Sequence, residues 1–249
     1  MDRQEELYSL LTGQDFDAES NQLKQLEAAK QCASAYAQAT NGIAVLSDFK
    51  KNVRHIYAGM FGHSLGLPGY VRNDDSAFES EIFDNVDGEE LLERHILELR
   101  FFNFLKSVPP TAKTNYYASC LLHFKRQGQP SLPVFHTTRY LLCHPNGSVW
   151  MGLCTYVPFP AISGVVGCSI VNTLTGEAIC TEQCDANLLS RRQKEILNLL
   201  AQGEGSKQIA DKLSISVNTV SRHRQDILTR LGVTNTAAAV EIGLRMRLI

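Results

Sequence analysis

The feature that most constrains this fold is a pair of helical patterns near the C-terminus, residues 206–213 and 217–231, with only residues 214–216 between them. In both patterns apolar residues recur at intervals of three or four, which is typical of helices that pack on a core. These residues are Ile209, Ala210 and Leu213 in the first pattern and Val220, Ile227 and Leu231 in the second. Two short helices joined this tightly predict a helix-turn-helix motif.

Helix-capping residues mark the ends of both patterns. Ser216 can accept the backbone N–H of Thr219, and Gly232 can adopt the left-handed conformation that ends a helix. Ser206 is the expected N-cap of the first helix of the motif. The sequence therefore predicts the boundaries of both helices.

A third helix precedes the motif. Ser190 and Gln193 have the spacing of a capping box, and Gly203 and Gly205 are expected to end this helix. Its inward stripe is predicted to contain Ile196, Leu197, Leu200 and Ala201.

The other side of helix 217–231 is unusual for a solvent-facing surface. Its polar residues form directional hydrogen bonds, and its single charged member is an arginine, which suits guanine or phosphate. The members of this arc are Asn218, Ser221, Arg222, Gln225 and Thr229. Any surface helix has a polar side, but the place of this helix as the second of the motif favours a surface that reads DNA bases.

Residues 187–249 resemble the LuxR-type helix-turn-helix domain of bacterial transcription regulators. The segments that carry the resemblance are LSRRQKEILNLLAQG, SKQIADKLSISVNTVSRHRQDILTRLGV and NTAAAVEIGLRMRLI. The resemblance implies that the major groove is read by Ser221, Arg222 and Gln225. We expect contacts to the DNA backbone from Lys207, Asn218, Thr219, His223 and Arg224. For His223, a bond to a neighbouring carbonyl is an equal alternative.

Two positions depart from the family's pattern. Ser221 stands where the family usually has a basic residue, which leaves the base preference open. Arg224 stands where an apolar residue is usual, and we expect its long side chain to extend toward a phosphate.

The last helix is expected over residues 235–247. Its small residues, Ala237, Ala238, Ala239 and Gly243, would allow close approach of a partner helix or of the domain's own core. The resemblance favours the first interpretation, which implies a homodimer.

The distribution of charge also separates the C-terminal part of the chain from the rest. The whole chain has a net charge of −2, but residues from 186 onward contain ten Lys and Arg against five Asp and Glu, a net charge of +5. The preceding part has 14 against 21, a net charge of −7. A locally basic domain can attract DNA phosphates whatever the total charge is.

The N-terminal part predicts an α+β domain preceded by a helical segment over residues 1–40. Residues 41–59 read as two strands joined by a turn at 48–52, and residues 88–108 read as a long amphipathic helix. The segments after this helix are rich in strand-forming residues, and a hairpin is expected at Pro145–Gly147. Helices covering one face of an antiparallel sheet would complete the domain.

This order of elements resembles a PAS domain, which we place at residues 41–172 with a linker at 173–186. The segments VLSDFKKNVRHIYAGMFGHSLGLP and LLCHPNGSVWMGLCTYV carry the resemblance. It implies a sensory or dimerising role and allows a small-molecule ligand. His63 or His95 would be the candidate ligands of a haem, but structural histidines are the favoured reading and no cofactor is expected. Strand aromatics could line a pocket, although core packing is favoured: Tyr116, Phe124, Tyr140, Trp150 and Tyr156.

An alternative function is a Cys- or His-dependent enzyme or a ligand-binding protein in the N-terminal domain. The candidate groups are His123, His136 and His144 with Cys120, Cys143 and Cys154. No phosphate-binding loop, carboxylate pair or nucleophile elbow accompanies them, so no catalytic residue is assigned. Cys180 and Cys184 form a lone C-x-x-x-C without a second ligand pair, so no metal is expected.

Other regulator classes fit less well. A phosphorylation receiver would need βα repeats, a sigma factor would need a basic helical domain upstream, and the pocket residues of an acyl-homoserine-lactone sensor cannot be matched. The N-terminus lacks the pattern of a signal peptide, the seven cysteines are scattered, and no membrane span is expected. The sequence therefore predicts a cytoplasmic, homodimeric regulator that binds double-stranded DNA.

Overall fold

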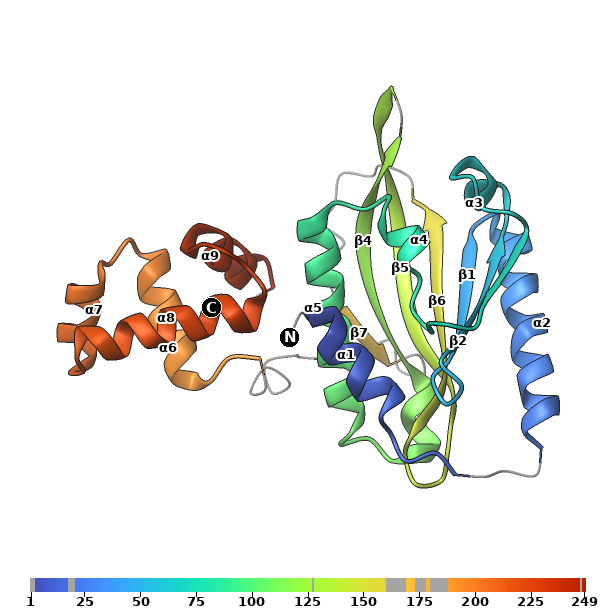
Figure 1. The fold of residues 1–249 in the computed structure, drawn as a ribbon, viewed down its shortest axis with the longest axis horizontal. Coiled ribbons are helices and arrows are strands. Elements are labelled where there is room, and N and C mark those ends of the chain that lie inside the picture. The colour runs from blue at the N-terminus through green and yellow to red at the C-terminus, as the bar shows by residue number, and fades with distance from the viewer. Residues whose placement is uncertain are drawn as a thin grey trace. The chain divides into compact units, whose positions relative to one another are not determined.

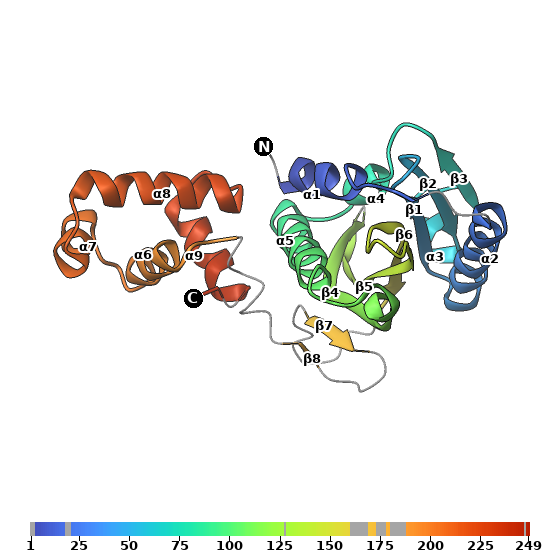
Figure 2. The same cartoon turned by 90° about the horizontal axis from the view of Figure 1, so that it is seen from below.

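A computed structural model describes residues 3–17, 21–126, 128–159, 169–172, 178–179, 188–246 and 248–249. Two compact units are present, one spanning Gln4–Ile179 and the other containing the C-terminal helices (Figures 1 and 2). Apart from residues 178–179, the expected linker at 173–186 lies outside the described residues. Among the helices that the structure describes, none has the length and apolar character needed to cross a lipid bilayer.

The N-terminal domain is built on one eight-stranded sheet in the order β3-β2-β1-β6-β5-β4-β7-β8. The pairings between neighbouring strands are antiparallel. The strands are β1 (Ile43–Asp48), β2 (Val53–Ala58), β3 (Tyr70–Asn73), β4 (Tyr116–Arg126), β5 (Gln129–Cys143), β6 (Val149–Pro158), β7 (Ser169–Asn172) and β8 (Ala178–Ile179). The expected α+β class is confirmed.

The first strand lies in the middle of the sheet. Leu46 of β1 faces His55 of β2 on one side and Leu153 of β6 on the other. The β1–β2 turn contains Asn52, whose φ of 57° lies in the left-handed region that asparagine tolerates well. The chain thus joins its early strand pair to a later three-stranded meander.

Helices lie on both sides of these strands. They are α1 (Arg3–Thr12), α2 (Gln22–Thr40), α3 (Met60–Ser64), α4 (Ser80–Phe83) and α5 (Gly88–Leu105), followed by the 3-10 helix η1 (Pro110–Asn115). Figures 1 and 2 show α2 and α5 on opposite sides of the strands. Alanines at 29, 33 and 37 allow α2 to pack closely on Ala44 and Leu46 of β1. Helices therefore lie on both sides of the strands, whereas the sequence predicted that they would cover one face.

The C-terminal domain consists of four helices: α6 (Arg191–Ala201), α7 (Ser206–Leu213), α8 (Val217–Leu231) and α9 (Thr236–Arg245). The expected four-helix domain is confirmed. The capping box at Ser190 and Gln193 is present, with bonds of 2.8 and 3.3 Å. The core includes Ile196, Leu197, Ile209, Val220, Ile227, Leu231 and Ile242.

Two local predictions were wrong. The N-cap of α7 is Gly205, whose N–H donates to the side chain of Gln208 at 2.7 Å, and Ser206 is the first helical residue. Ala201 is exposed, because it is the last residue of α6 and the chain turns away at Gly203 before another turn could cover it.

Candidate nucleic-acid interface

The helix α8 is fixed on the domain core by one side only. Ser216 accepts the N–H of Thr219 at 3.1 Å, and Gly232 ends the helix with a φ of 68°. Val220, Ile227 and Leu231 are buried beneath it. Both ends and the inward stripe match the sequence prediction, so the direction of the opposite side is set by packing.

The predicted arc lies on that opposite side. All five of its members are exposed: Asn218, Ser221, Arg222, Gln225 and Thr229. Within the described part of the chain, no hydrogen bond or ion pair engages the side chain of Arg222 or Gln225. These two side chains are therefore available to a ligand, and they lie one helical turn apart on α8.

The residues expected near the DNA backbone have different surroundings. Lys207 of α7 is exposed, as is Thr219, whose hydroxyl is 2.9 Å from that of Ser216. His223 is half-buried, and its Nδ1 atom is enclosed without a hydrogen-bond partner among the described residues. The bond from this nitrogen to a neighbouring carbonyl is thus not formed.

Arg224 makes contacts that sequence reasoning missed. Its Nη1 donates to the hydroxyl of Ser206 at 2.7 Å, and its Nη2 donates to the hydroxyl of Thr236 at 2.9 Å. Ser206 and Thr236 are the first residues of α7 and α9, so one guanidinium joins three helices. The acceptors lie 18 and 12 residues away, and no local pattern in the sequence indicates them.

Positive charge on this domain is partly neutralised, but not on the arc. Glu195 pairs with Arg192 at 2.9 Å and with Arg191 at 3.4 Å, and Lys212 pairs with Glu204. The hydrogen bond from Arg192 lowers the pKa of Glu195. Among the described residues, no ion pair involves Lys207 or Arg222. These two cations can therefore interact with an external anion.

The small residues of α9 divide between two environments. Ala239 and Gly243 are buried, and a methyl group at Gly243 would come within 2.9 Å of Leu197 Cδ2. Ala237 is exposed, and so is Leu244, at 56% of its surface. Ala239 and Gly243 thus belong to the domain's own core, Ala238 is half-buried, and Ala237 faces outward.

The interior of the N-terminal domain contains a buried group of charged residues. Arg94 of α5 lies 3.1 Å from Glu79 and 2.9 Å from Glu98, and Tyr156 donates to Glu79 at 2.7 Å. Burial opposes the charge of Arg94, but Glu98 and the other acidic neighbours outweigh it and raise its pKa. Burial raises the pKa of Glu98 to about 7.

Some polar atoms around this group have no partner among the described residues. They are Arg94 Nε, the Tyr140 hydroxyl and His95 Nε2. An unpaired buried donor costs about 1–3 kcal/mol, so such atoms call for an explanation such as a bound water or ligand.

The two candidate haem ligands lie in different places. His63 is exposed on α3, with its Nδ1 3.0 Å from the carbonyl of Leu67. His95 is buried against the edge of Phe83, and burial lowers its pKa to about 3. The described residues contain no group of three or more His, Cys, Asp or Glu that could hold a metal.

The strand aromatics form packing contacts. Tyr140 stacks on Phe101 at 5.1 Å, and Trp150 stacks on His144 at 5.6 Å. Phe124 and Tyr156 are also buried, whereas Tyr116 is half-buried against Phe104. Core packing is therefore the role that these contacts indicate.

The Cys and His candidates lie mainly on β4, β5 and β6, where Cys120 is the register partner of His136. Cys154 and His136 both contact the hydroxyl of Thr138, at 3.6 and 3.1 Å. Burial raises the pKa of Cys154 well above its usual range and that of Cys143 to about 11. His123 instead bonds Glu90 at 2.7 Å. Cys180 and Cys184 lie outside the described residues.

Comparison with known proteins decides the identity of the C-terminal domain. Residues 187–242 match the family described as bacterial regulatory proteins, luxR family. The C-terminal domain is a LuxR-family domain. The matched residues span α6, α7, α8 and most of α9.

Relatives and solved structures were also found. The chain is 37% identical over 95 residues to the oxygen regulatory protein NreC of Staphylococcus aureus. The aligned segment covers 38% of this chain and 43% of NreC, so the chain spans less than half the length of this relative. A structure of the VqmA dimer of Vibrio cholerae, described as a LuxR-type receptor, is 17% identical with a TM-score of 0.28, covering 89% of this chain and 86% of that one. Escherichia coli SdiA is 18% identical with a TM-score of 0.26, covering 99% and 97%.

Proposed function

We propose that the chain is a cytoplasmic transcription regulator whose LuxR-family domain binds double-stranded DNA. The observation that carries the proposal is the exposed arc of α8, on which Arg222 and Gln225 have no partner among the described residues. In this proposal the bases are read by Ser221, Arg222 and Gln225. The DNA backbone is contacted by Lys207, Asn218, Thr219, His223 and Arg224.

The chemistry of the arc suits base recognition. Arg222 and Gln225 lie on adjacent turns and reach neighbouring positions of the groove, where arginine can bond guanine and glutamine can bond adenine in bidentate fashion. Ser221 has a short side chain and would tolerate more than one base. The net charge of +5 from residue 186 onward adds attraction to phosphates.

A homodimer is part of the proposal. Leu244 and Ala237 face outward on α9, two helical turns apart, and an exposed leucine on the same side as a small residue suits the close approach of a second α9. Two copies would present two α8 helices to two half-sites. Leu244→Glu should shift the chain toward monomer in sedimentation experiments. Asn198→Glu, which adds the same single negative charge at an exposed position of α6, is the matched control.

The N-terminal domain is proposed to be a PAS-like regulatory domain. Its strand pair, helical middle and three-stranded meander support this assignment. The unpaired buried donors beside Arg94 are compatible with a small ligand in the interior. We infer that the chain is not an enzyme, because protonated buried thiols are poor nucleophiles. The proposal includes no cofactor.

The experiment that tests the proposal is selection of a preferred duplex from a random DNA pool by the full-length protein. Affinity for this duplex and for a scrambled version is then measured at one salt concentration, because salt alone changes both. We expect a preference of at least about 10³ for the selected duplex. Failure to enrich any sequence would contradict the proposed function.

A further inference from the structure

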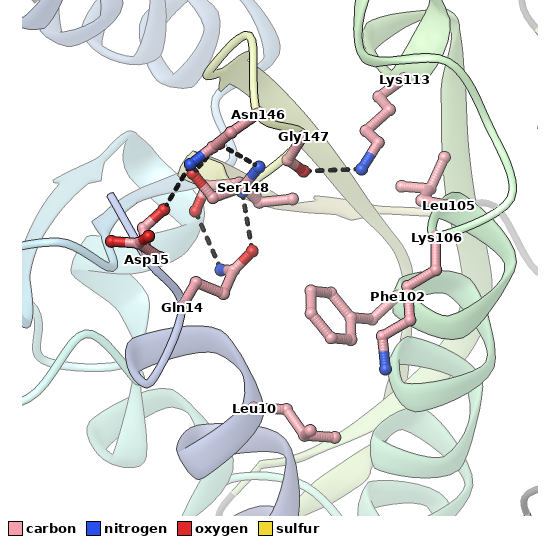
Figure 3. Close-up of a pocket in the computed structure, with 11 residues that line it drawn as sticks. Leu10, Gln14, Asp15, Phe102, Leu105, Lys106, Lys113, Asn146, Gly147 and Ser148 are labelled. Atoms are coloured by element: carbon pink, nitrogen blue, oxygen red, sulfur yellow. Dashed lines mark hydrogen bonds between the residues drawn. The ribbon is translucent and has the colours of Figure 1, made fainter. Parts of the chain in front are cut away.

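A cavity of about 330 Å³ lies in the N-terminal domain between α1, the end of α5 and the turn that joins β5 to β6 (Figure 3). Small-molecule sites usually have volumes of roughly 300–1,000 Å³, so this cavity is at the small end of that range. Its apolar walls come from Leu10, Phe102, Leu105 and Val149. Phe102, Leu105 and Val149 are buried, so these walls are held by the domain core.

Hydrogen bonds hold one side of the cavity in place. Gln14, which follows α1, accepts the N–H of Val149 at 2.8 Å and donates to its carbonyl at 3.2 Å. Asn146 donates to the carbonyl of Asp15 at 2.7 Å (Figure 3). The amide groups at this rim are therefore already paired, and the cavity is formed without a ligand.

Lys113 of η1 differs from these amides, because its ammonium has hydrogen-bond donors left over. This residue is only 6% exposed, and its ammonium donates to the carbonyl of Gly147 at 2.6 Å. An ammonium has three N–H donors, and within the described part of the chain no carboxylate forms an ion pair with Lys113. Burial lowers the pKa of Lys113, as expected for a charge without a counterion.

The other charged groups that line the cavity are exposed. Lys106 lies at the rim, with its ammonium 4.9 Å from the centre of the Phe102 ring. Asp15 lies at the opposite rim and is also exposed. The two lysines and the aspartate give the lining a net charge of +1. Because Lys106 and Asp15 are exposed, the buried charge is that of Lys113.

We propose that this cavity binds a small monocarboxylate with an apolar body. The carboxylate pairs with the ammonium of Lys113, and the hydrocarbon part packs against Phe102, Leu105 and Leu10. A single negative charge matches the lining, whereas a polyanion would be opposed by the apolar walls and by Asp15. The ligand would contact α1 through Leu10 and α5 through Phe102 and Leu105. None of this depends on DNA binding.

The test uses hexanoate and its uncharged counterpart hexan-1-ol, titrated calorimetrically into the full-length protein at pH 7. We expect hexanoate to bind at least about 10-fold more tightly than hexan-1-ol, because a charge-assisted bond to a buried ammonium is stronger than a neutral one. Equal affinities would overturn carboxylate recognition. No detectable binding of hexanoate at millimolar concentration would overturn the site.

Two variants locate the ligand. Lys113→Met keeps a long apolar side chain and should weaken hexanoate binding by about 10-fold or more while leaving hexan-1-ol unchanged. Lys24→Met, at an exposed position of α2, is the matched control and should bind like the wild type. Leu10→Trp should fill the cavity from α1 and abolish binding of both compounds, which also covers the case in which Lys113→Met does not fold. Unchanged hexanoate affinity in Lys113→Met or Leu10→Trp would overturn the proposal.

Discussion

Arg224 donates a hydrogen bond to Ser206 across 2.7 Å and thereby joins α8 to the first residue of α7. The same guanidinium reaches Thr236 at the start of α9. A charged donor bonded to two hydroxyls fixes the angle between helices, whereas a phosphate contact would bind DNA directly. The two roles can be separated experimentally.

Arg224→Met should reduce the protection of α8 amides against hydrogen exchange in the full-length protein, with a loss of about 1–3 kcal/mol. If Arg224 mainly positions α8, the slope of log K against log salt should stay unchanged. A slope reduced by about 0.9 would instead assign it to phosphate contact. Thr236→Val removes one acceptor without changing charge and should reproduce part of the loss of protection.

Lys207 offers a cleaner measure of phosphate contact. Lys207→Ala should weaken binding to selected and scrambled duplexes alike and reduce the salt slope by about 0.9. Lys212→Ala on the same helix is the control, because its ammonium is paired with Glu204. Equal slopes for the wild type and Lys207→Ala would mean that α7 does not approach the backbone.

Arg222 and Gln225 should determine sequence preference. Arg222→Ala or Gln225→Ala is expected to cost about 1–3 kcal/mol on the selected duplex and to lower the preference over scrambled DNA. Ser221→Ala should cost less, because its side chain is short. Equal losses of binding free energy on both duplexes at one salt concentration would show that the arc contacts phosphates and does not read bases.

Buried histidines should make the N-terminal domain sensitive to acid. Burial lowers the pKa of His95 to about 3, below the unfolded value of 6.5. Below pH 6.5 the unfolded chain therefore binds a proton that the folded chain does not, and stability falls as the pH falls toward 3. His95 contributes up to about 1.4 kcal/mol per pH unit. Glu98, with its pKa raised to about 7, acts in the opposite direction between its unfolded value of 4.5 and 7, with the same maximum slope, and cancels most of the His95 loss in that range. The remaining loss comes from the other buried histidines, His55 and His136, because burial lowers their pKa values as well.

Urea denaturation can measure this effect through Trp150, the only tryptophan in the chain, which reports on the N-terminal domain. His95→Phe should lose less stability between pH 7 and pH 5 than the wild type. Phe83→Leu alters the ring packed against His95 but keeps the titrating group, so its loss of stability should be similar at both pH values. The same pH dependence in His95→Phe and the wild type would refute the prediction.

Local patterns in the sequence predicted the elements that local forces define. The ends of α8 followed from Ser216 and Gly232, and the β1–β2 pair followed from two strand patterns around a polar turn. The short strand β3 was not predicted, because its four residues alternate between exposed and half-buried and offer little apolar signal.

Contacts between segments that lie far apart in the sequence could not be predicted from local patterns. Arg94 and Glu98 would ordinarily mark the solvent side of an amphipathic helix, yet both are buried because α5 is enclosed over much of its surface. The contacts of Arg224 depend on how α7 and α9 pack beside α8. The direction of the candidate reading surface was predictable because it requires only helical periodicity and a buried stripe.

The position of β1 has a consequence for how the chain folds. Because Leu46 pairs with Leu153, the central strand has one edge without its partner until β6 has been synthesised. Sheets closed by such distant pairings fold slowly, and exposed strand edges favour association between unfinished chains. During translation, α2 can already cover one face of the β1–β2 hairpin. We therefore expect α2 to reduce aggregation of the unfinished chain on the ribosome.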